Sequence, residues 1–110
     1  MDQVLWNKKA LDTTRKLPDG IKKEIGLLIQ RLQFGQVLKM PFSRSMPSLG
    51  NGCYELRVKD ENGNFRVFYY LKLKGFIIIF HVFQKKSEKT LKRELEIAKK
   101  NLKELLNEKK

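Results

Sequence analysis

The chain has 110 residues, of which 41% are hydrophobic and 33% are charged. This length allows one hydrophobic core, so we expect a single domain over residues 1–110, and the composition excludes a disordered chain. The 24 Lys and Arg residues outnumber the 12 Asp and Glu residues, which gives a formal net charge of +12. Such an excess favours RNA, DNA or an acidic protein as the partner, although a surface charged only for solubility stays open.

The content of cysteine and histidine and the length of the apolar runs exclude further classes of protein. Cys53 is the one cysteine, so a disulfide within the chain and a Cys-based zinc site are excluded, and with His81 as the one histidine no metal centre or other cofactor is expected. The longest apolar run, Phe76 to Phe80, is far shorter than the roughly 18 residues of a membrane span. The sequence begins without the apolar core of a signal peptide. We therefore expect a cytoplasmic protein that does not enter a membrane.

The first third of the chain predicts a short strand and two helices. Residues 4–6 are apolar and read as an edge strand, and the residues after them predict a first helix that ends before Pro18. A second helix follows, capped at or near Asp19, with one apolar stripe at helical spacing: Ile21, Ile25, Leu28 and Leu32. Gly35 suits the left-handed position that ends a helix. The two helices together predict an N-terminal helical hairpin.

The remainder of the chain predicts a sheet and a last helix. Residues 36–52 contain two prolines and three serines and predict a connecting loop, which carries Arg44. Strand-like runs follow at residues 53–59, 65–72 and 76–85, joined by short turns that predict an antiparallel meander. Ser87 can cap a final helix with an apolar stripe at Leu91, Leu95, Ala98, Leu102 and Leu105. The predicted fold class is α+β, with the helical hairpin, a small antiparallel sheet of about three or four strands, and the C-terminal helix.

Alternation along the predicted strands sorts their side chains by face, because successive residues of a strand point to opposite sides. Under the simplest registration, four basic side chains share one face: Arg57, Arg66, His81 and Lys85. The same parity adds three aromatic residues to that face: Phe68, Tyr70 and Phe83. Phe80 and Val82 are expected with Ile78 on the opposite face. Cations on a sheet are costly unless an anion meets them, so the basic face predicts a surface for phosphate.

A face of this kind suits RNA. Arginine forks bind phosphate oxygens in pairs, and aromatic rings stack on unpaired bases. RNA also carries its own nucleophile, the 2′-hydroxyl, so a protein can cleave it by orienting that group, stabilising the phosphorane with cations and moving protons. We expect four catalytic residues, with the histidine as candidate acid or base: Arg57, Arg66, Lys85 and His81. The expected RNA-binding residues are Lys86, Tyr70, Phe83 and Arg44.

Each of these residues also has a purely structural interpretation. The arginines Arg57 and Arg66 can pair with Glu55 or with exposed acids across the hairpin. His81 can be a packed, hydrogen-bonded strand residue. Four further lysines are interpreted as the solvated face of the last helix: Lys99, Lys100, Lys109 and Lys110.

At the same residues the sequence resembles the RelE/ParE toxin superfamily, and within it the HigB-type toxins that include phage-derived toxin-like proteins. The similarity covers nearly the whole chain. Residues 4–10 are similar to the opening of the family, and residues 49–57 contain its leucine, glycine and tyrosine-glutamate-leucine-arginine pattern. Residues 65–69 resemble the next motif, and residues 81–87 with Thr90 resemble the last. Each motif alone is weak, but four in order make the resemblance specific.

The resemblance implies a RelE-like fold and the toxin of a type II toxin–antitoxin system. Such toxins are metal-independent endoribonucleases (mRNA interferases) that cut mRNA on the ribosome and inhibit translation. The implied partners are the ribosome with mRNA and a cognate helix-turn-helix antitoxin, with operator DNA contacted only through the antitoxin complex. By position, three residues match the basic active-site positions of the family, Arg57, Arg66 and Lys85, with His81 and Lys86 beside them.

Two other functions stay open at this point. The superfamily includes non-catalytic poisons of DNA gyrase on the same fold, and a fold does not settle a function. A basic binding module that mainly captures an antitoxin is the other alternative.

Overall fold

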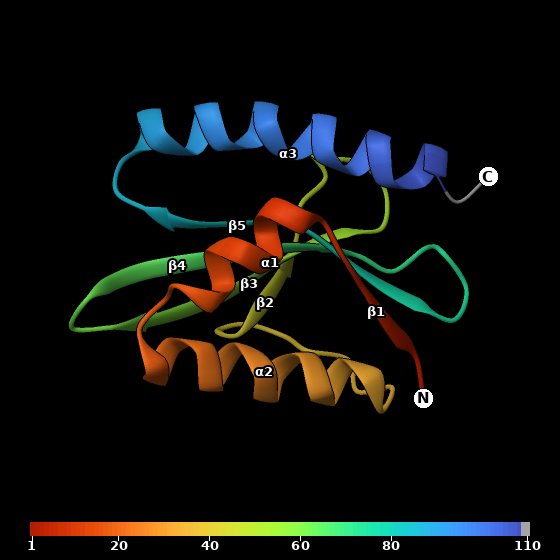
Figure 1. The fold of residues 1–110 in the computed structure, drawn as a ribbon, viewed down its shortest axis with the longest axis horizontal. Helices are drawn as coiled ribbons and strands as arrows, with labels where there is room; N and C mark the ends of the chain where they lie inside the picture. The colour runs from red at the N-terminus through yellow and green to blue at the C-terminus, as the bar shows by residue number, and fades with distance from the viewer. Residues whose placement is uncertain (109–110) are drawn as a thin grey trace.

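The most apolar segment, β5 (Phe76–Lys85), lies inside a five-stranded sheet with the strand order β1-β5-β4-β3-β2. The computed structural model describes residues 1–108, so Lys109 and Lys110 of the predicted solvated face lie outside the described residues. Figure 1 shows α3 (Glu88–Glu108) above the sheet and α2 (Asp19–Gln33) below it. Because helices cover both faces, residues 77–80 are fully buried, as in the central strands of layered α/β proteins.

The sheet contains the predicted meander and two further strands. β3 (Cys53–Asp60) pairs antiparallel with β4 (Gly63–Tyr70), which pairs antiparallel with β5, so the meander is confirmed. β1 (Gln3–Trp6) is the predicted edge strand and runs parallel to β5. β2 (Ser43–Ser45) pairs antiparallel with β3 inside the predicted loop. The expectation of about three or four antiparallel strands is therefore wrong, because the sheet is mixed and has five.

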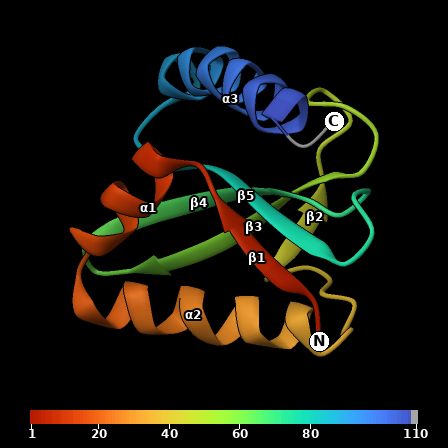
Figure 2. The same ribbon diagram turned by 45° about the vertical axis from the view of Figure 1, so that its right-hand side comes forward.

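The helices follow the predicted sequence ranges, but they do not open the chain as a hairpin. Strand β1 precedes α1 (Lys8–Arg15), and the two helices pack on different strands, α1 on β5 and α2 on β3 (Figure 2). The Asn7 side chain caps α1 by accepting a hydrogen bond of 2.9 Å from the Ala10 amide. The N-cap of α2 is Pro18, with Asp19 in the first turn. Gly35 has the expected positive φ of 85°.

The core is divided by the sheet into two clusters. The lower cluster joins α1 and α2 to one face and contains the predicted stripe of α2, in which Ile21, Ile25, Leu28 and Leu32 are buried. The upper cluster lies under α3 and contains Ala98 and Leu102, with Leu91, Leu95 and Leu105 partly buried. The oxygens of Ser87 hold the start of α3 through the amides of Thr90 and Leu91, as expected for a cap.

A bulge in β5 changes the predicted faces. Phe68 pairs with His81 and Tyr69 pairs with Ile79, so Phe80 is the extra residue. Phe80 and His81 consequently both face α3, the former in the upper cluster and the latter through contacts to the helix. Val82 returns to the lower cluster. The expectation that Phe80 and Val82 share a face is therefore wrong, since strict alternation fails at a bulge.

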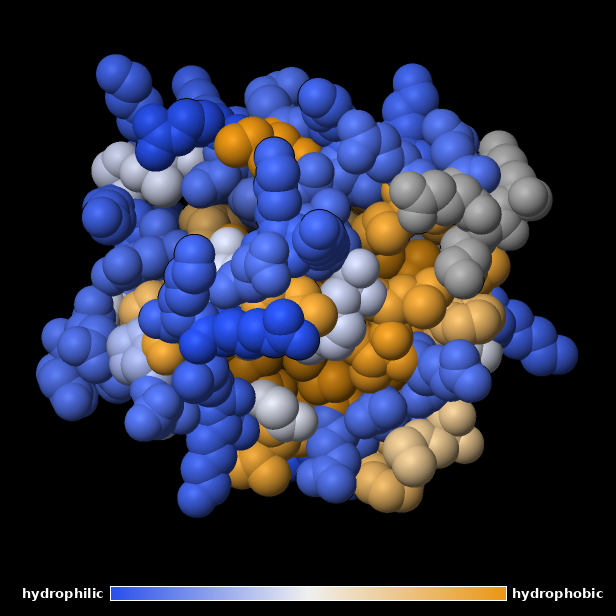
Figure 3. All heavy atoms as spheres, viewed as in Figure 1, coloured by the Kyte–Doolittle hydropathy of each residue, from blue (hydrophilic) through white to orange (hydrophobic). Residues whose placement is uncertain are grey.

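The face of the molecule seen in Figure 3 is largely hydrophilic, with apolar atoms gathered near the middle of the view, where β1 crosses in front of the sheet. Within residues 1–108, no helix is both long and apolar enough to cross a membrane. In the same range, no three His, Cys, Asp or Glu residues come together as a possible metal site.

Two residues of α2 that are two positions apart test the attachment of this helix to the sheet. Ile25 is 1% exposed in the lower cluster, whereas Leu27 is 53% exposed on the outer side. We expect Ile25→Ala to lower the free energy of unfolding by about 3 kcal/mol, because it leaves a cavity in a packed core. Leu27→Ala should change it by under about 0.5 kcal/mol. Urea denaturation measures both, and similar losses in the two variants would contradict the packing of α2.

Candidate functional site

Two arginines lie side by side on the face of the sheet against which α3 packs. Arg57 of β3 and Arg66 of β4 are direct partners in the ladder, so their side chains leave the same face. The predicted common face of these two residues is therefore confirmed. Helix α3 packs over β5. In the strand order, β4 lies between β5 and β3, and β2 is the edge strand next to β3.

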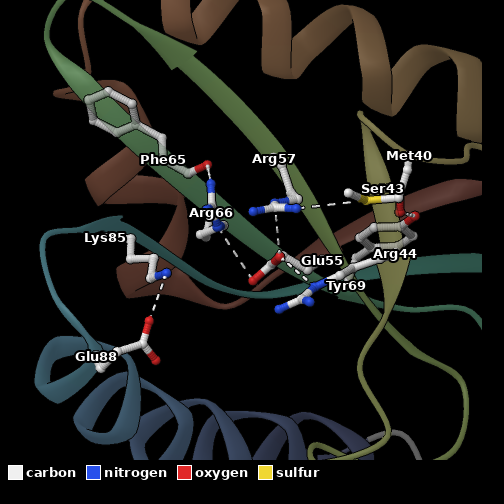
Figure 4. Close-up of polar contacts among 10 residues, drawn as sticks. All are labelled: Met40, Ser43, Arg44, Glu55, Arg57, Phe65, Arg66, Tyr69, Lys85 and Glu88. Atoms are coloured by element: carbon white, nitrogen blue, oxygen red, sulfur yellow. Dashed lines mark hydrogen bonds and ion pairs between the residues drawn. The ribbon is translucent and has the colours of Figure 1, made fainter.

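A buried carboxylate lies between the arginines (Figure 4). Glu55 is 1% exposed, and its Oε1 lies 3.5 Å from Nε of Arg57 and 3.2 Å from Nε of Arg44, while Oε2 lies 3.6 Å from Nε of Arg66. The four residues, Glu55 with Arg44, Arg57 and Arg66, are called the arginine cluster below. A buried carboxylate keeps its charge when cations and donors surround it, and here three guanidinium groups do so.

Arg44 reaches the cluster from strand β2. It is the ladder partner of Glu55, and its Nε donates a hydrogen bond to Oε1. The expectation from the sequence that Arg44 lies in a loop is wrong, because Arg44 is the middle residue of the three-residue strand β2. The strand is too short and polar to show an alternating pattern.

The arginine cluster carries a surplus of positive charge. Three guanidinium groups face one carboxylate, so two positive charges remain to attract an anion. Burial lowers the pKa of Arg66 from its ordinary value, Glu55 opposes this shift, and the charges of Arg57 and Arg44 add to it. An arginine nevertheless stays protonated at neutral pH. The Arg66 side chain is only 7% exposed, whereas Arg57 and Arg44 are 30% and 47% exposed and present their guanidinium groups to solvent.

His81 lies on the expected face but turns to α3. Its Nε2 lies 2.8 Å from Oε2 of Glu94, and its Nδ1 lies 3.4 Å from Nδ2 of Asn101. The Asn101 amide is a donor, so Nδ1 accepts and the ring proton belongs on Nε2, which donates to Glu94. Asn101 also donates to the Phe80 carbonyl at 3.0 Å. Both ring nitrogens thus hold α3 to β5, and the histidine makes no contact with the arginine cluster.

Lys85 is the last residue of β5 and Lys86 follows it, near the start of α3. Lys85 pairs in the ladder with Asn64, one step along the face from Arg66, and its Nζ lies 3.2 Å from Oε1 of Glu88. Figure 4 shows this contact on the α3 side of Arg66. Lys86 is exposed. Lys85 is therefore next to the cluster in the sheet, and neither lysine is part of the ion pairs of the cluster.

The two aromatic candidates differ in exposure. Phe83 is 4% exposed and packs between His81 and Phe68, with ring centroids 5.5 Å and 5.2 Å away. Tyr70 is partly buried beside the upper cluster. Little of the Phe83 ring is therefore open to a base, and its visible role is to pack the sheet against α3.

Two further titratable groups, Tyr69 in the lower cluster and Cys53 in the upper cluster, are buried. The Tyr69 hydroxyl shares a hydrogen bond with Ser43, and burial raises the Tyr69 pKa while this bond opposes the shift. Burial also raises the pKa of the Cys53 thiol to about 11. Both groups are neutral at physiological pH, so neither adds charge to the face.

A pocket of about 410 Å³ adjoins the arginine cluster. Arg57 and Arg66 line it together with the segment that precedes β2, residues 40–42. Sequence reasoning missed this pocket. It offered Glu55 as the structural partner of Arg57 and Arg66, a pairing that the structure shows, but it did not foresee that Arg44 joins the same carboxylate. For Glu55 a signal exists, since alternation puts it on the face of Arg57, two residues away. For the pocket no signal exists, because a loop with two prolines has no periodicity.

The fold is similar to that of the E. coli toxin RelE in three solved structures. The E. coli toxin RelE, in the free state and with two arginines replaced by alanine, has a TM-score of 0.61 and 13% identity over 86% of this chain and 95% of that chain. The isolated E. coli RelE toxin gives 0.56 and 17%, over 84% of this chain and 98% of that one. A chain of the intact E. coli RelBE toxin–antitoxin complex gives 0.53 and 19%, over 79% and 100%. The RelE-like α+β fold is thus confirmed.

Residues 12–103 match the family described as phage derived protein Gp49-like (DUF891). This match covers most of the chain, so the protein belongs to the phage-derived Gp49-like family. The resemblance to the RelE/ParE superfamily and its phage-derived members is thereby confirmed. No curated protein matches the chain.

Removing the central carboxylate tests the arginine cluster. Glu55→Ala leaves three guanidinium groups together and a buried Arg66 without its counter-charge, so we expect a loss of about 3–5 kcal/mol in the free energy of unfolding. The loss should shrink at high salt, which screens repulsion between the arginines. Urea denaturation at two salt concentrations measures it. Glu96→Ala is the control, since Glu96 is 80% exposed and should change stability by under about 0.5 kcal/mol. Equal losses would contradict the cluster.

The Cys53 thiol should be unreactive in the native protein. Its pKa of about 11 and its 2% exposure leave almost no accessible thiolate at pH 8, so an aromatic disulfide reagent should react only as the chain unfolds. In denaturant the reaction should be fast, because the pKa returns to about 8.5. Since the native pKa is the higher one, stability should fall as the pH rises from about 9 toward 11. Rapid native labelling at pH 8 would contradict this burial.

Proposed function

We propose that this protein is the toxin of a type II toxin–antitoxin system and acts as a metal-independent endoribonuclease on mRNA bound to the ribosome, in the manner of HigB-type toxins. The observation that carries the proposal is the arginine cluster, an anion site with two surplus charges on the open part of a RelE-like sheet. Membership of the Gp49-like family supports the toxin role, and the excess of 24 basic over 12 acidic residues supports a phosphate-rich target.

In the proposed reaction the 2′-hydroxyl of the mRNA attacks the adjacent phosphorus atom. The bond from phosphorus to the 5′-oxygen breaks, leaving a 2′,3′-cyclic phosphate and a 5′-hydroxyl, and one proton moves from the nucleophile to the leaving oxygen. Arg57 and Arg66 bind and neutralise the phosphorane, and Arg44 guides the neighbouring phosphate. All electrons come from the RNA, so no redox partner is needed.

Proton transfer falls to the titratable side chains, because arginine stays protonated. Lys85 is the first candidate, since it lies one step along the face from Arg66 and its Glu88 partner is 81% exposed and can release it. His81 can act as acid or base only after leaving Glu94. Lys86 is proposed to bind RNA phosphate, and Tyr70 and Phe83 to support the face on which the RNA lies.

The proposed partners follow from the same role. A cognate antitoxin of the helix-turn-helix class would inhibit the toxin, and operator DNA would be contacted only through that complex. The E. coli RelBE complex supports an antitoxin partner of some kind. Since the proposed target is the translating ribosome, we place the protein in the cytoplasm.

The test is cleavage of mRNA on translating ribosomes, with the new 5′ ends mapped after brief exposure to the protein. We expect Arg57→Ala to reduce kcat/KM by about 100-fold or more, because a donor to the transition state is lost, and Lys85→Ala to change the pH profile. The matched controls are Arg15→Ala, whose side chain is 70% exposed on α1, and Lys99→Ala on α3. Both should cut like the wild type.

Two outcomes would favour another function. Intact mRNA together with DNA damage signalling would point to a gyrase poison. Absence of any toxicity in cells that express the protein alone would point to a module that captures an antitoxin. An Arg57→Ala or Arg66→Ala protein that cuts ribosome-bound mRNA at the wild-type rate would contradict the assignment of these residues.

A further inference from the structure

The pocket beside the arginine cluster combines three kinds of lining. Arg57 and Arg66 supply positive charge, and Glu24 of α2 supplies a carboxylate. Between α2 and β2, residues 40–42 supply an apolar wall that is open to solvent, with Met40 56% and Phe42 40% exposed. The volume of about 410 Å³ lies within the range of small-ligand pockets, roughly 300–1,000 Å³.

The apolar wall, residues 40–42, contacts Arg57 of the arginine cluster. The Arg57 amide donates to the Phe42 carbonyl at 2.9 Å, and Nη1 of Arg57 lies 3.8 Å from Sδ of Met40. The amides of Phe42 and Ser43 both donate to the Lys39 carbonyl, at 2.9 Å and 3.1 Å. The wall therefore keeps a fixed relation to the guanidinium group of Arg57, so an anion bound there has an apolar surface at a set place beside it.

Polar side chains that line the pocket have unused hydrogen-bonding capacity. Within residues 1–108, the side chains of Glu24, Lys59 and Asn64 form no hydrogen bond or ion pair. Glu24 repels negative charge, so the part of the pocket beside it does not favour an anion, whereas the part beside Arg57, Arg66 and Lys59 does. An occupant must therefore present an anion to Arg57, a flat or apolar part to Phe42, and a donor to Glu24.

A nucleotide has this combination of groups. Its phosphate meets the arginines, its base stacks on an aromatic ring, and the amino groups of adenine, cytosine and guanine donate to carboxylates or amides. An inorganic anion would leave the apolar wall unused. An apolar peptide would leave the arginines without a counter-charge.

We propose that this pocket holds the base of the nucleotide next to the phosphate bound by Arg57 and Arg66, and that Phe42 and Glu24 set which bases are accepted. The proposal rests on the proposed function, because it assigns the substrate as single-stranded RNA. Phe42 is the stacking platform. Glu24 is the group that reads the edge of the base, favouring bases with an amino group over uracil.

Binding of fluorescent single-stranded RNA oligonucleotides that differ at one base tests the pocket without requiring cleavage. We expect Phe42→Ala to weaken binding about tenfold, as for the loss of a base stack, and Phe42→Leu to weaken it by less. Glu24→Gln should reduce the preference among the four RNAs. Phe34→Ala is the matched control, since Phe34 is 65% exposed at the end of α2 and does not line the pocket. Unfolding curves verify that each variant is folded.

The same variants are then compared in cleavage on ribosomes. Changed base preference at the cut sites in Phe42→Leu or Glu24→Gln would support the pocket, while unchanged binding and unchanged cut sites in all three variants would overturn it. Failure of the proposed function looks different. If the wild type cuts no mRNA but oligonucleotide binding depends on Phe42, the base site stands and the nuclease does not. If cleavage depends on Arg57 but not on Phe42 or Glu24, the nuclease stands and the base site does not.

Discussion

The Glu55 carboxylate is 1% exposed, and it can remain charged there because three guanidinium groups surround it. The dependence is mutual, since Arg66 is nearly as buried and needs the carboxylate to offset the loss of water. The carboxylate thereby fixes the direction of all three arginines. Without it, mutual repulsion would drive the guanidinium groups apart and the face would lose its fixed group of positive charges.

The surroundings of the arginine cluster are completed by a short edge strand, β2, and by the loop segment that precedes it. β2 contributes three residues, of which Arg44 joins the cluster and Ser43 holds the buried Tyr69 hydroxyl. The segment before it is held by the backbone of Arg57 and forms the apolar side of the adjoining pocket. On the other side of β4, hydrogen bonds of His81 to Glu94 and of Asn101 to the Phe80 carbonyl hold α3 to β5.

Periodicity predicted the parts of the fold that have it. The stripes of α2 and α3, the meander and the common face of Arg57 and Arg66 all follow from spacing along the chain. The strand number was wrong because β2 has no pattern. The roles around the site depend on contacts between distant residues. The hydrogen bond of His81 to Glu94 and the position of Phe42 beside the arginines depend on the folded structure, and the sequence contains no pattern that predicts them.

The bulge at Phe80 bears on how this chain is aligned with distant relatives. Two neighbouring residues there face α3, so every later position of β5 is out of phase with the earlier ones. At 13–19% identity, a gap shifted by one residue near the bulge would exchange Lys85 with Gln84 in the alignment. A basic position would then be assigned to the wrong side of the sheet. Alignments of such relatives are safest when anchored on strand pairing rather than on residue similarity.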